Sequence, residues 1–351
     1  MRFSDQLSIV PVKALVPTPD NLAVCAAVLA NGGVVGLPTE TVYGLAAEAS
    51  SAAGIALIFK IKGRPVDHPL IVHVADLNQA LRWFERDSAR DEFASQFATR
   101  AMQAFWPGPL TVIVKRHADA PNFACGGQDT VGLRSPSHPI AAKLLSDMAK
   151  QGSWGVAAPS ANRFGRISPT CAGHVIDDLG DDCAFVLDGG DCDHGIESTI
   201  LDCSSVRIRI LRPGSITKQM LENALQCSIE DGPSVIDSQT PRVSGSLDSH
   251  YAPMTKTVLI ATPDLDQAIL ACLDAKLRVG VLARHPCPNH FKGSATIIWL
   301  VASAQADQYA HSLYANLRAL DCQCLDCLMV VAPPNEAQWD GVADRVKRST
   351  A

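Results

Sequence analysis

The stretch Val34-Val35-Gly36-Leu37-Pro38-Thr39-Glu40-Thr41-Val42-Tyr43-Gly44-Leu45 decides how the first half of this 351-residue chain folds. Its four small or apolar residues at the start predict a strand, and the Thr-Glu-Thr part places two hydroxyl groups beside a carboxylate where that strand ends. Upstream, Thr18 caps a predicted helix, Pro19 suits its first turn, and Gly32-Gly33 ends it. The stretch is the first of several polar segments that follow predicted strands.

Strands and helices are mixed irregularly over the next two hundred residues. Apolar or alternating runs predict strands near 69–74, 110–115, 130–134, 154–158, 184–188, 198–202 and 206–212. Helical periodicity predicts helices at 52–61, 91–104, 138–150 and 216–225. Because the order lacks steady βαβ alternation, we expect an α/β fold whose sheet has mixed strand directions and helices packed on it.

Residues 228–255 interrupt this pattern. Ser, Asp, Gly and Pro dominate the segment, and a connection of that length is either functional or disordered. A more regular alternation follows, with strands predicted at 257–261, 279–283, 296–300 and 328–332 and helices at 264–275, 304–319 and 339–348. The pattern predicts a second, small three-layer α/β domain after a linker.

The composition limits the classes of protein to which this chain can belong. Hydrophobic residues make up 47% of the chain and charged residues 19%, which is typical of a globular protein. The net charge of −6 gives no general attraction to a polyanion. The amino-terminal residues lack the apolar core of a signal peptide, and no apolar run reaches the roughly 18 residues of a membrane span. We therefore expect a cytoplasmic protein whose twelve cysteines are reduced and mostly buried.

Three of these cysteines form a cluster at Cys322, Cys324 and Cys327. A zinc site would need a fourth ligand, for which Cys287 or His311 are the candidates. The alternative is a turn between a helix and a strand with small apolar side chains, and we favour it.

Motifs of familiar catalytic classes are missing. The chain has no G-x-x-x-x-G-K-[ST], G-x-G-x-x-G, G-x-S-x-G or H-E-x-x-H motif. The polar segments instead supply cations, hydroxyl groups and turn amides, without an evident covalent nucleophile. Such a site holds anions and lets bound substrates react with each other.

Several cations stand at predicted strand or helix ends. Lys62 and Arg64 flank Gly63 at the end of a helix, where they could simply complement the helix dipole in water. His73 lies inside an apolar strand, a position in which a lone histidine is more often a core residue, but beside the cationic turn an anion site is an equal alternative. Arg134 closes another apolar strand, which suits a bidentate clamp on a carboxylate or phosphate. Arg212 follows a later strand in the same way.

The order of the segments resembles the Sua5/YrdC/YwlC family. The motifs that carry the resemblance are P-T-E-T-V-Y-G-L, K-G-R-P, P-L-I-V-H, W-P-G-P-L-T, V-G-L-R-S-P, A-P-S-A-N, G-I-E-S-T-I and R-P-G, and they span roughly residues 35–215. His250-Tyr251-Ala252-Pro253 resembles the H-Y-A-P element of the two-domain Sua5 type. The predicted carboxyl-terminal domain resembles the Sua5 domain more weakly than the earlier motifs resemble theirs. The segment before the H-Y-A-P element lacks the usual proline, which leaves the path of the linker open.

The resemblance implies a YrdC-like twisted mixed sheet with a large concave cavity at 1–227, a linker at 228–255 that reaches over the active site, and a small Rossmann-like Sua5 domain at 256–351. It also implies an L-threonylcarbamoyladenylate synthase, a nucleotidyltransferase that makes threonylcarbamoyl-AMP and pyrophosphate from L-threonine, bicarbonate and ATP. The product would pass to the machinery that makes the t6A modification of tRNA, and Mg²⁺ would accompany ATP.

Site residues are carried over by motif. The resemblance implies catalytic roles for Lys62 and Arg64. It implies contacts with L-threonine from Thr41, His73, Arg134, Ala158 and Ser198. It implies contacts with ATP from Lys62, Arg64, His68, Thr130, Ser160, Asn162, Ser168, Arg212 and Tyr251. Metal ligands are not identified. Because Tyr251 lies on the linker, its truncation is expected to weaken substrate retention more than stability.

Two rival functions use the same residues. A cationic cavity could bind RNA, either as the main function or as weak RNA binding beside an enzymatic one. Against this, the chain is acidic and lacks interleaved aromatic residues. Carbamoyl transferases of hydrogenase maturation contain a similar domain, but they add acylphosphatase and zinc-finger modules that this sequence does not show.

Overall fold

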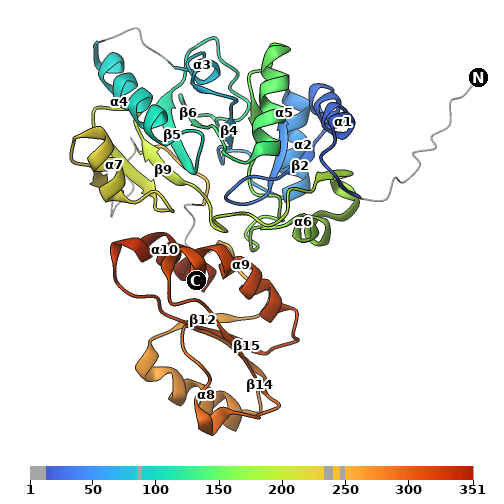
Figure 1. The fold of residues 1–351 in the computed structure, drawn as a ribbon, viewed down its shortest axis with the longest axis vertical. Helices are drawn as coiled ribbons and strands as arrows, with labels where there is room; N and C mark the ends of the chain where they lie inside the picture. Colours follow the sequence, from blue (N-terminus) through green and yellow to red (C-terminus); the bar gives the residue numbers. More distant parts are fainter. Residues whose placement is uncertain (1–12, 85–88, 233–239, 246–249, 351) are drawn as a thin grey trace, which may run out of the picture.

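The computed structural model describes residues 13–84, 89–232, 240–245 and 250–350, which form two sheets with their helices (Figure 1). The strands of the larger sheet are β1 (Lys13–Leu15), β2 (Val35–Leu37), β3 (Gly44–Glu48), β4 (Ile71–His73), β5 (Leu110–Lys115), β6 (Thr130–Arg134), β7 (Val156–Ala157), β8 (Phe185–Leu187), β9 (Thr199–Asp202), β10 (Arg209–Arg212) and β11 (Glu230–Asp231). Its helices are α1 (Pro19–Ala30), α2 (Ala52–Lys62), α3 (Leu77–Ala80), α4 (Ala89–Phe105), α5 (Pro139–Lys150), α6 (Ala172–Leu179) and α7 (Lys218–Leu225).

The smaller sheet belongs to the carboxyl-terminal domain. Its strands are β12 (Thr257–Ile260), β13 (Val279–Ala283), β14 (Ile297–Val301) and β15 (Cys327–Val331), and its helices are α8 (Leu265–Asp274), α9 (Ala306–Asp321) and α10 (Asp340–Ser349). All of its strand pairs are parallel, in the order β12-β15-β13-β14. Figure 1 shows α9 and α10 between the two sheets and α8 on the far face of the smaller one.

Local signals explain the helix ends. Thr18 accepts a hydrogen bond from the main-chain nitrogen of Asn21, and Pro19 begins α1. Ser51 caps α2 in the same way, and Gly63 ends it in the left-handed conformation with φ of 64°. This ending turns the chain sharply after Lys62 and directs Arg64 back toward the sheet.

The larger sheet mixes parallel and antiparallel pairs, in the order β1-β8-β2-β3-β7-β4-β6-β5-β9-β10-β11. The predicted mixed α/β fold is therefore confirmed. β4 and β6 are parallel, whereas β7 runs antiparallel to both β3 and β4. Mixed directions bring the polar ends of strands that are far apart in the chain to the same edge of the sheet.

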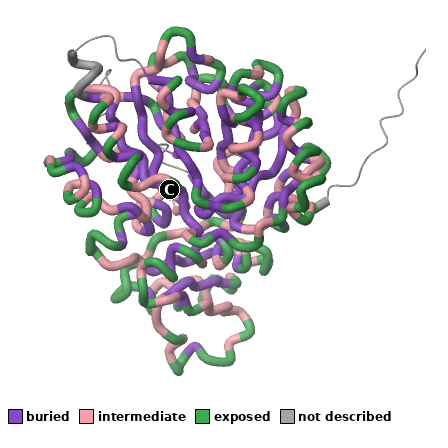
Figure 2. The backbone as a smooth tube through the Cα atoms, turned by 45° about the horizontal axis from the view of Figure 1, so that its top comes forward, coloured by how far each residue is buried: buried purple, intermediate pink, exposed green. Residues whose placement is uncertain are grey.

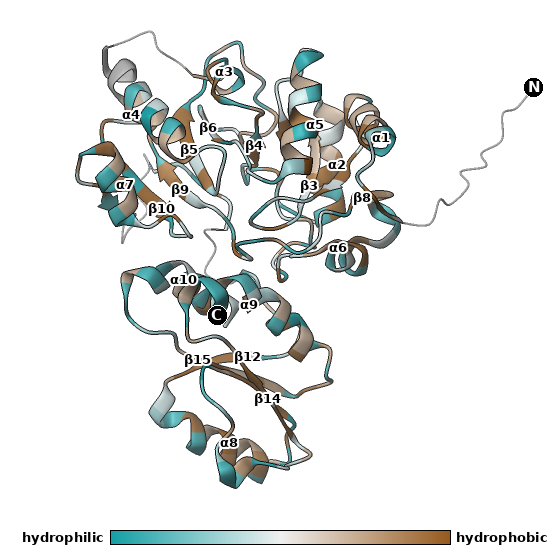
Figure 3. Ribbon diagram, viewed as in Figure 1, coloured by the Kyte–Doolittle hydropathy of each residue, from teal (hydrophilic) through white to brown (hydrophobic). Residues whose placement is uncertain are grey.

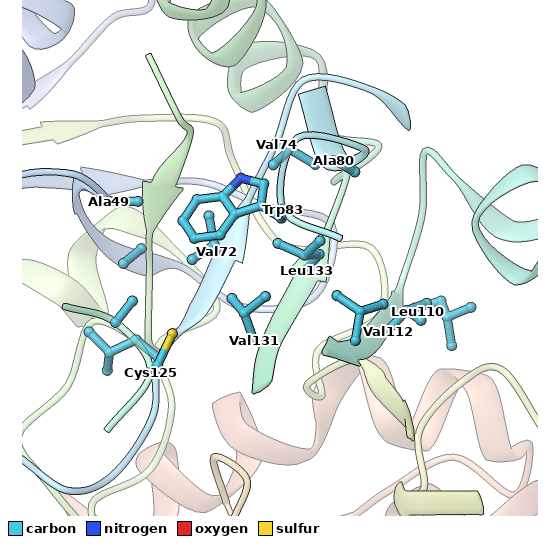
Figure 4. Packing of buried hydrophobic residues seen from close by; sticks show 14 of the residues in the cluster. Ala49, Val72, Val74, Ala80, Trp83, Leu110, Val112, Cys125, Val131 and Leu133 are labelled. Atoms are coloured by element: carbon cyan, nitrogen blue, oxygen red, sulfur yellow. The ribbon is translucent and has the colours of Figure 1, made fainter. Parts of the chain in front are cut away.

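The main core lies between the larger sheet and its helices. Figure 4 shows Trp83 packed among Val72, Val131 and Leu133, all of which are buried. Figure 2 shows the buried stretches of chain gathered in the interior, and Figure 3 shows apolar residues along the strands of both sheets. Burial of this apolar surface gives the sheet a fixed frame for the polar groups at its edge.

A separate apolar cluster joins the two domains. Apolar residues of α9 recur every three or four positions, at Tyr309, Leu313, Tyr314, Leu317 and Leu320, and all are buried. They pack with residues from the other domain or the linker, namely Val42, Ile167, Ile196 and Tyr251. The carboxyl-terminal domain is thus held against the face of the larger sheet domain that carries the polar strand ends.

Three features differ from the sequence-based expectation. β3 begins at Gly44, inside the segment that was expected to be a polar loop, because it pairs with both β2 and β7. Residues 172–179 form α6, which the periodicity did not reveal. Within the predicted linker 228–255, Glu230–Asp231 pair with β10, while 233–239 and 246–249 lie outside the described residues.

The cysteines are free, and six of the twelve are buried. Cys322 ends α9, Cys324 has a left-handed conformation, and Cys327 begins β15, so the trio forms a turn between a helix and a strand. Across 13–84, 89–232, 240–245 and 250–350, no group of three or more His, Cys, Asp or Glu residues is placed to hold a metal ion. None of the described helices is long and apolar enough to cross a membrane.

Candidate functional site

A cavity that is partly open to solvent lies at the edge of the larger sheet where the polar strand ends meet. Its volume is about 40 Å³. It is lined by Thr39, Thr41, Val42, Gly44, Ile71, His73, Arg134, Ala158, Pro159, Ser160, Glu197, Ser198, Arg212, Ser244, His250 and Tyr251.

Strand register explains why these residues meet. His73 pairs with Arg134 in the parallel β4–β6 ladder, so both side chains stand at the carboxyl ends of neighbouring strands. β10 runs antiparallel to β9, which brings Arg212 beside the residues that lead into β9, Ser198 among them. Ala158 follows β7, and its nitrogen donates to the main-chain oxygen of Ile71.

Arg134 is held by protein groups on all sides of its guanidinium. Its Nη2 lies 2.7 Å from Glu40 Oε1, its Nη1 donates to Thr41 Oγ1 at 2.8 Å, and its Nε donates to the main-chain oxygen of Gly108 at 3.3 Å. Burial alone would raise the pKa of Glu40, but the charge of Arg134 outweighs it and lowers that pKa below its usual value. The clamp predicted for a ligand carboxylate is therefore already occupied by a buried carboxylate of the protein.

His73 faces the cavity as a neutral group. Its side chain is buried, and its Nδ1 has no hydrogen-bond partner within the described parts of the chain. Burial, followed by the nearby charge of Arg134, lowers the pKa of His73 to about 3. A neutral imidazole can offer one hydrogen bond to a ligand without adding charge.

Ser198 and Arg212 form the opposite wall. Arg212 donates from Nε to the main-chain oxygen of Ser198 at 3.0 Å and from Nη2 to its Oγ at 3.2 Å. Thr111 Oγ1 lies 2.8 Å from the same Ser198 Oγ. Because the partners of this hydroxyl are an arginine and a threonine, Ser198 is not activated as a nucleophile.

Lys62 and Arg64 lie beside the cavity and do not line it among the described residues. Lys62 Nζ donates to the main-chain oxygens of Ser160 and Asn162, at 2.6 Å each, and burial lowers its pKa well below the usual value. Arg64 Nη2 donates to Pro69 O at 3.0 Å and to Ser244 Oγ at 3.2 Å. Lys62 therefore fixes the loop that carries Ser160, and contact of either cation with a ligand stays a prediction.

The other residues predicted to contact ATP are spread around the cavity. Ser160 lines it directly, whereas Thr130 lines a separate adjoining pocket that shares Ile71 and Ser244 with it. Ser168 Oγ donates to Glu197 Oε1 at 2.5 Å instead of facing the cavity. Asn162 uses its Nδ2 to bind the main-chain oxygens of Arg163 and Arg166, which closes its own loop.

His68 belongs to an aromatic cluster rather than to the cavity wall. Its ring lies 5.6 Å from that of Phe164, and the ring of His250 lies 5.9 Å from Phe164 on an edge-to-face contact. The Arg64 guanidinium stands 5.7 Å from the same Phe164 ring. Phe164 thus connects the loop after α2 with the linker.

The linker closes the cavity through what we call the covering segment, residues 240–245 and 250–253. Ser244, His250 and Tyr251 of this segment line the cavity. Tyr251 has a φ of 63° and only 1% of its surface exposed, and a side chain at Gly245 would come within 2.2 Å of its hydroxyl oxygen. Gly245 is needed for this close approach.

Because Tyr251 is buried, its truncation should lower stability as well as substrate retention. The ring packs in the interdomain cluster with Tyr314, 5.6 Å away between centroids. Removing such a ring leaves a cavity that costs about 3–5 kcal/mol. The linker position alone gave no sign of this, because burial depends on how the second domain docks.

Sequence reasoning also missed residues that line or border the cavity, among them Glu40, Glu197, Ser244 and Phe164. Glu40 and Glu197 each sit beside a predicted site residue, within the P-T-E-T and G-I-E-S-T segments. A carboxylate directly before a hydroxyl residue was a usable signal for both. Ser244 and Phe164 carried no signal, since their place depends on the path of the covering segment.

The sequence and the structure are similar to one group of proteins. The Sua5_yciO_yrdC family model, described as "Telomere recombination", matches residues 27–214. The Sua5_C model, described as "Threonylcarbamoyl-AMP synthase, C-terminal domain", matches residues 216–351. Both models together span most of the chain.

Individual relatives are similar to this chain over nearly its whole length. A threonylcarbamoyl-AMP synthase of Bacillus subtilis is 34% identical over 338 residues, which cover 93% of this chain and 92% of the relative. The protein of that name from Pyrococcus abyssi is 30% identical, with 94% of each chain covered. The crystal structure of P. abyssi Sua5 complexed with L-threonine superposes with a TM-score of 0.81 at 29% identity, again covering 94% of each chain.

Proposed function

The chain belongs to the Sua5/YciO/YrdC family and carries the Sua5 carboxyl-terminal domain, and on this premise we propose that it joins L-threonine, bicarbonate and ATP into threonylcarbamoyl-AMP and pyrophosphate. This makes it an L-threonylcarbamoyladenylate synthase, a nucleotidyltransferase whose product serves the t6A modification of tRNA. The relatives that carry the name threonylcarbamoyl-AMP synthase support the activity, and the P. abyssi complex supports L-threonine as a substrate.

The observation that carries the proposal is the convergence of Thr41, His73, Arg134, Ser198 and Arg212 on one cavity. These groups offer hydrogen bonds to an amino acid and positive charge to an anion. The Ser198 hydroxyl is held by Arg212 and Thr111, and the Thr41 hydroxyl is held by Arg134. The site is therefore suited to orient substrates that react with each other.

L-threonine is proposed to occupy the inner part of the cavity. Thr41, His73, Ala158 and Ser198 would surround it, and neutral His73 would bond its hydroxyl or carboxylate through the unpaired Nδ1. Arg134 would attract the threonine carboxylate by its charge while keeping Glu40 as a partner. Buried polar groups left without a partner cost about 1–3 kcal/mol, so valine should be rejected strongly.

ATP is proposed to enter on the side of Arg212 and the covering segment. Arg64 and Arg212 both bond Ser244 in this structure, and a triphosphate would replace Ser244 as their partner. Lys62 would act mainly by holding the Ser160 loop, and Ser160, Asn162, Ser168, Thr130, His68 and Tyr251 would border the nucleotide. Because Ser244 of the covering segment occupies both guanidiniums, this segment would move when a triphosphate binds.

The proposed reaction has two steps. The amine of L-threonine takes up CO₂ from bicarbonate to form a carbamate, and an oxygen of that carbamate attacks the α-phosphorus of ATP. The bond from the α-phosphorus to the bridging oxygen breaks, and pyrophosphate leaves. Arg64 and Arg212 would stabilise the charge that grows on the phosphate oxygens. A closed covering segment would keep water from the labile carbamate.

Mg²⁺ is proposed to enter with ATP as part of that substrate. Mg²⁺ is usually held by phosphate oxygens, waters and at most one or two carboxylates. The residues described here hold no cluster of three or more acidic, His or Cys groups, which fits an ion carried chiefly by the phosphates. The ion would supply further charge neutralisation on the departing pyrophosphate.

The direct test incubates the protein with Mg-ATP, bicarbonate and labelled L-threonine and detects labelled threonylcarbamoyl-AMP and pyrophosphate. Pyrophosphate release should depend on threonine and should nearly vanish when valine replaces it. Release without threonine, or no release at all, would contradict the proposal. Retention of tRNA without any adenylate would instead favour the RNA-binding alternative.

A further inference from the structure

Glu197 receives hydrogen bonds from both domains at once. Its carboxylate accepts from Ser168 Oγ at 2.5 Å within its own domain. From the carboxyl-terminal domain, it accepts from the Tyr314 hydroxyl at 2.9 Å and from Arg345 Nε at 2.7 Å. Glu197 also lines the cavity and directly precedes Ser198. One side chain of the cavity wall is thus held largely by residues of the other domain.

Arg345 reaches the same wall through its other nitrogens. Nη2 donates to the main-chain oxygen of Glu197 at 3.1 Å, and Nη1 donates to the main-chain oxygen of Pro213 at 3.0 Å. Pro213 directly follows Arg212, and Glu197 directly precedes Ser198. A single planar guanidinium therefore fixes the spacing of two chain segments that present Ser198 and Arg212 to the cavity.

Arg345 is an unusual residue for a simple domain contact. Its side chain is 0% exposed, whereas its neighbours on the same face of α10, Val342 and Val346, are apolar. A buried ion pair is weak evidence for stability, because apolar residues of similar volume often serve as well. Its directed hydrogen bonds to the cavity wall give a better account of an arginine at this position.

Arg345 and Tyr314 also contact the covering segment. The Arg345 guanidinium lies 5.5 Å from the centroid of the Tyr251 ring, and the Tyr314 ring lies 5.6 Å from it. The main-chain nitrogen of the preceding residue, His250, donates to the oxygen of Arg348 on α10 at 3.0 Å. The helices α9 and α10 thus meet the cavity wall and its cover at one place.

We propose that Arg345, with Tyr314, is a positioning residue through which the carboxyl-terminal domain sets the geometry of the active site. Arg345 holds Glu197 and Pro213, and through them it places Ser198 and Arg212 for substrate binding. Arg345 itself does not touch the reacting atoms. The inference rests on the proposed function, and it assigns to the second domain a part in catalysis that its own fold does not reveal.

A second interdomain arginine offers a matched control. Arg318 on α9 pairs with Asp178 on α6, with Nη2 2.6 Å from Oδ2 and Nη1 3.0 Å from Oδ1. Like Arg345, it joins the carboxyl-terminal domain to a carboxylate of the other domain. Asp178 is not among the residues that line the cavity in the described parts of the chain. R318K and R345K thus make the same chemical change at two interdomain ion pairs.

The test measures kcat and KM for threonine and ATP by pyrophosphate release, threonine affinity by calorimetry, and the thermal melt of the full chain. Lysine keeps the charge at position 345 but cannot reach Glu197 Oε2, Glu197 O and Pro213 O together. R345K should lower kcat/KM for threonine about tenfold or more, as expected when positioned groups move by a fraction of an ångström. R318K should stay within about twofold of wild type. Equal losses in both variants, or wild-type kinetics in R345K, would overturn the proposal.

A double variant separates positioning from charge balance. E197Q/R345M removes both charges of this pair, and Asp344, which also pairs with Arg345, keeps Arg348 Nε as a partner at 2.9 Å. If Arg345 positions the wall, this variant should melt close to wild type and still lose about tenfold or more in kcat/KM. Recovery of wild-type kinetics together with stability would show that Arg345 only neutralises Glu197.

Should R345K fail to fold, Y314F offers a second test. It removes one hydrogen bond from Glu197 and should lower kcat/KM severalfold, and unchanged kinetics would count against the proposal.

Threonine binding distinguishes this inference from the proposed function. Wild-type protein that binds threonine but forms no adenylate would refute the proposed reaction. The positioning role would then be tested by the affinity of R345K for threonine, which should be lower than that of the wild type. Wild-type protein that binds no threonine would refute both.

Discussion

Arg212 donates from Nη1 to the main-chain oxygen of Ser244 at 3.0 Å, so a cation at the end of β10 holds the covering segment over the cavity. Arg64 bonds the hydroxyl of the same serine from the other side, at 3.2 Å. The two guanidiniums proposed to bind the triphosphate are thus bonded to Ser244 while the site is closed. Exchange of Ser244 for phosphate would link nucleotide binding to movement of the segment.

S244A should strengthen ATP binding modestly. The change removes the hydroxyl partner of Arg64 and keeps the main-chain oxygen that Arg212 uses. One hydrogen bond is worth about 1 kcal/mol net, so the KM for ATP should fall by up to about fivefold. Hydrogen exchange at residues 240–245 should become faster in the same variant. A raised KM for ATP would show that Ser244 helps to bind the nucleotide instead of competing with it.

R64A should fold and lose most of its pyrophosphate release. Arg64 makes hydrogen bonds to Pro69 O and Ser244 Oγ, so its removal leaves no buried acid without a partner. Loss of one preorganised donor at a transition state lowers kcat by about 100-fold or more. R82A serves as the control, because Arg82 also stacks on an aromatic ring, that of Trp154 at 4.1 Å, but lies on the surface away from the cavity. Near-normal turnover in R64A would remove this arginine from the proposed mechanism.

H73Q should reduce the loss of stability at acidic pH. Burial lowers the pKa of His73 from its ordinary 6.5 to about 3, so between these values the unfolded chain binds more protons than the folded chain. Stability is therefore complete above about pH 6.5 and falls as the pH drops toward 3. From pH 7 to pH 5, one such histidine accounts for about 2 kcal/mol of lost stability.

Urea unfolding at pH 7 and pH 5 measures this difference. His250, whose pKa is likewise lowered to about 3 chiefly by burial, remains in both proteins and cancels in the comparison. The same pH dependence in H73Q and wild type would mean that His73 is charged or solvated in the folded protein.

Y251F should separate the hydroxyl of Tyr251 from its ring. The hydroxyl is buried without a hydrogen-bond partner among the residues described, so its loss should change the melting temperature by less than about 2 °C. If the hydroxyl meets the bound nucleotide, the KM for ATP should rise. Y251A should instead lower the melting temperature clearly, because the ring fills the interdomain cluster. A stable Y251A protein would mean that the segment is not packed as the structure places it.

Much of the fold was predictable because its signals act over a few residues. Thr18 and Pro19 begin α1, and Gly63 ends α2, by contacts within one helical turn. The spacing of Tyr309, Leu313, Leu317 and Leu320 predicts which face of α9 is buried. β3 was missed because it owes its existence to partners on both sides. α6 was missed because it begins without a side-chain cap, whereas the equally short α7 is capped by Thr217.

The candidate site was predictable in its chemistry and less so in its contacts. Thr41, His73, Ala158, Ser160, Ser198, Arg134, Arg212 and Tyr251 line one cavity, as motifs at strand ends led us to expect. The motifs did not reveal that Arg134 bonds Glu40, that Lys62 bonds the main chain of the Ser160 loop, or that Ser168 bonds Glu197. These contacts depend on side-chain directions that residue type alone does not determine.

The sequence by itself determined most of the helices and strands, the polar strand ends and the residue types that can bind an amino acid and an anion, since caps and periodicity act between near neighbours in the chain. Only the tertiary structure decided that Arg345 pairs with Glu197, which lies 148 positions earlier in the chain. That pair forms because parallel and antiparallel strands bring Glu197 to one edge of the sheet and the apolar face of α9 docks the second domain against it. Contacts over such separations follow from the packing of whole elements, so no local pattern encodes them.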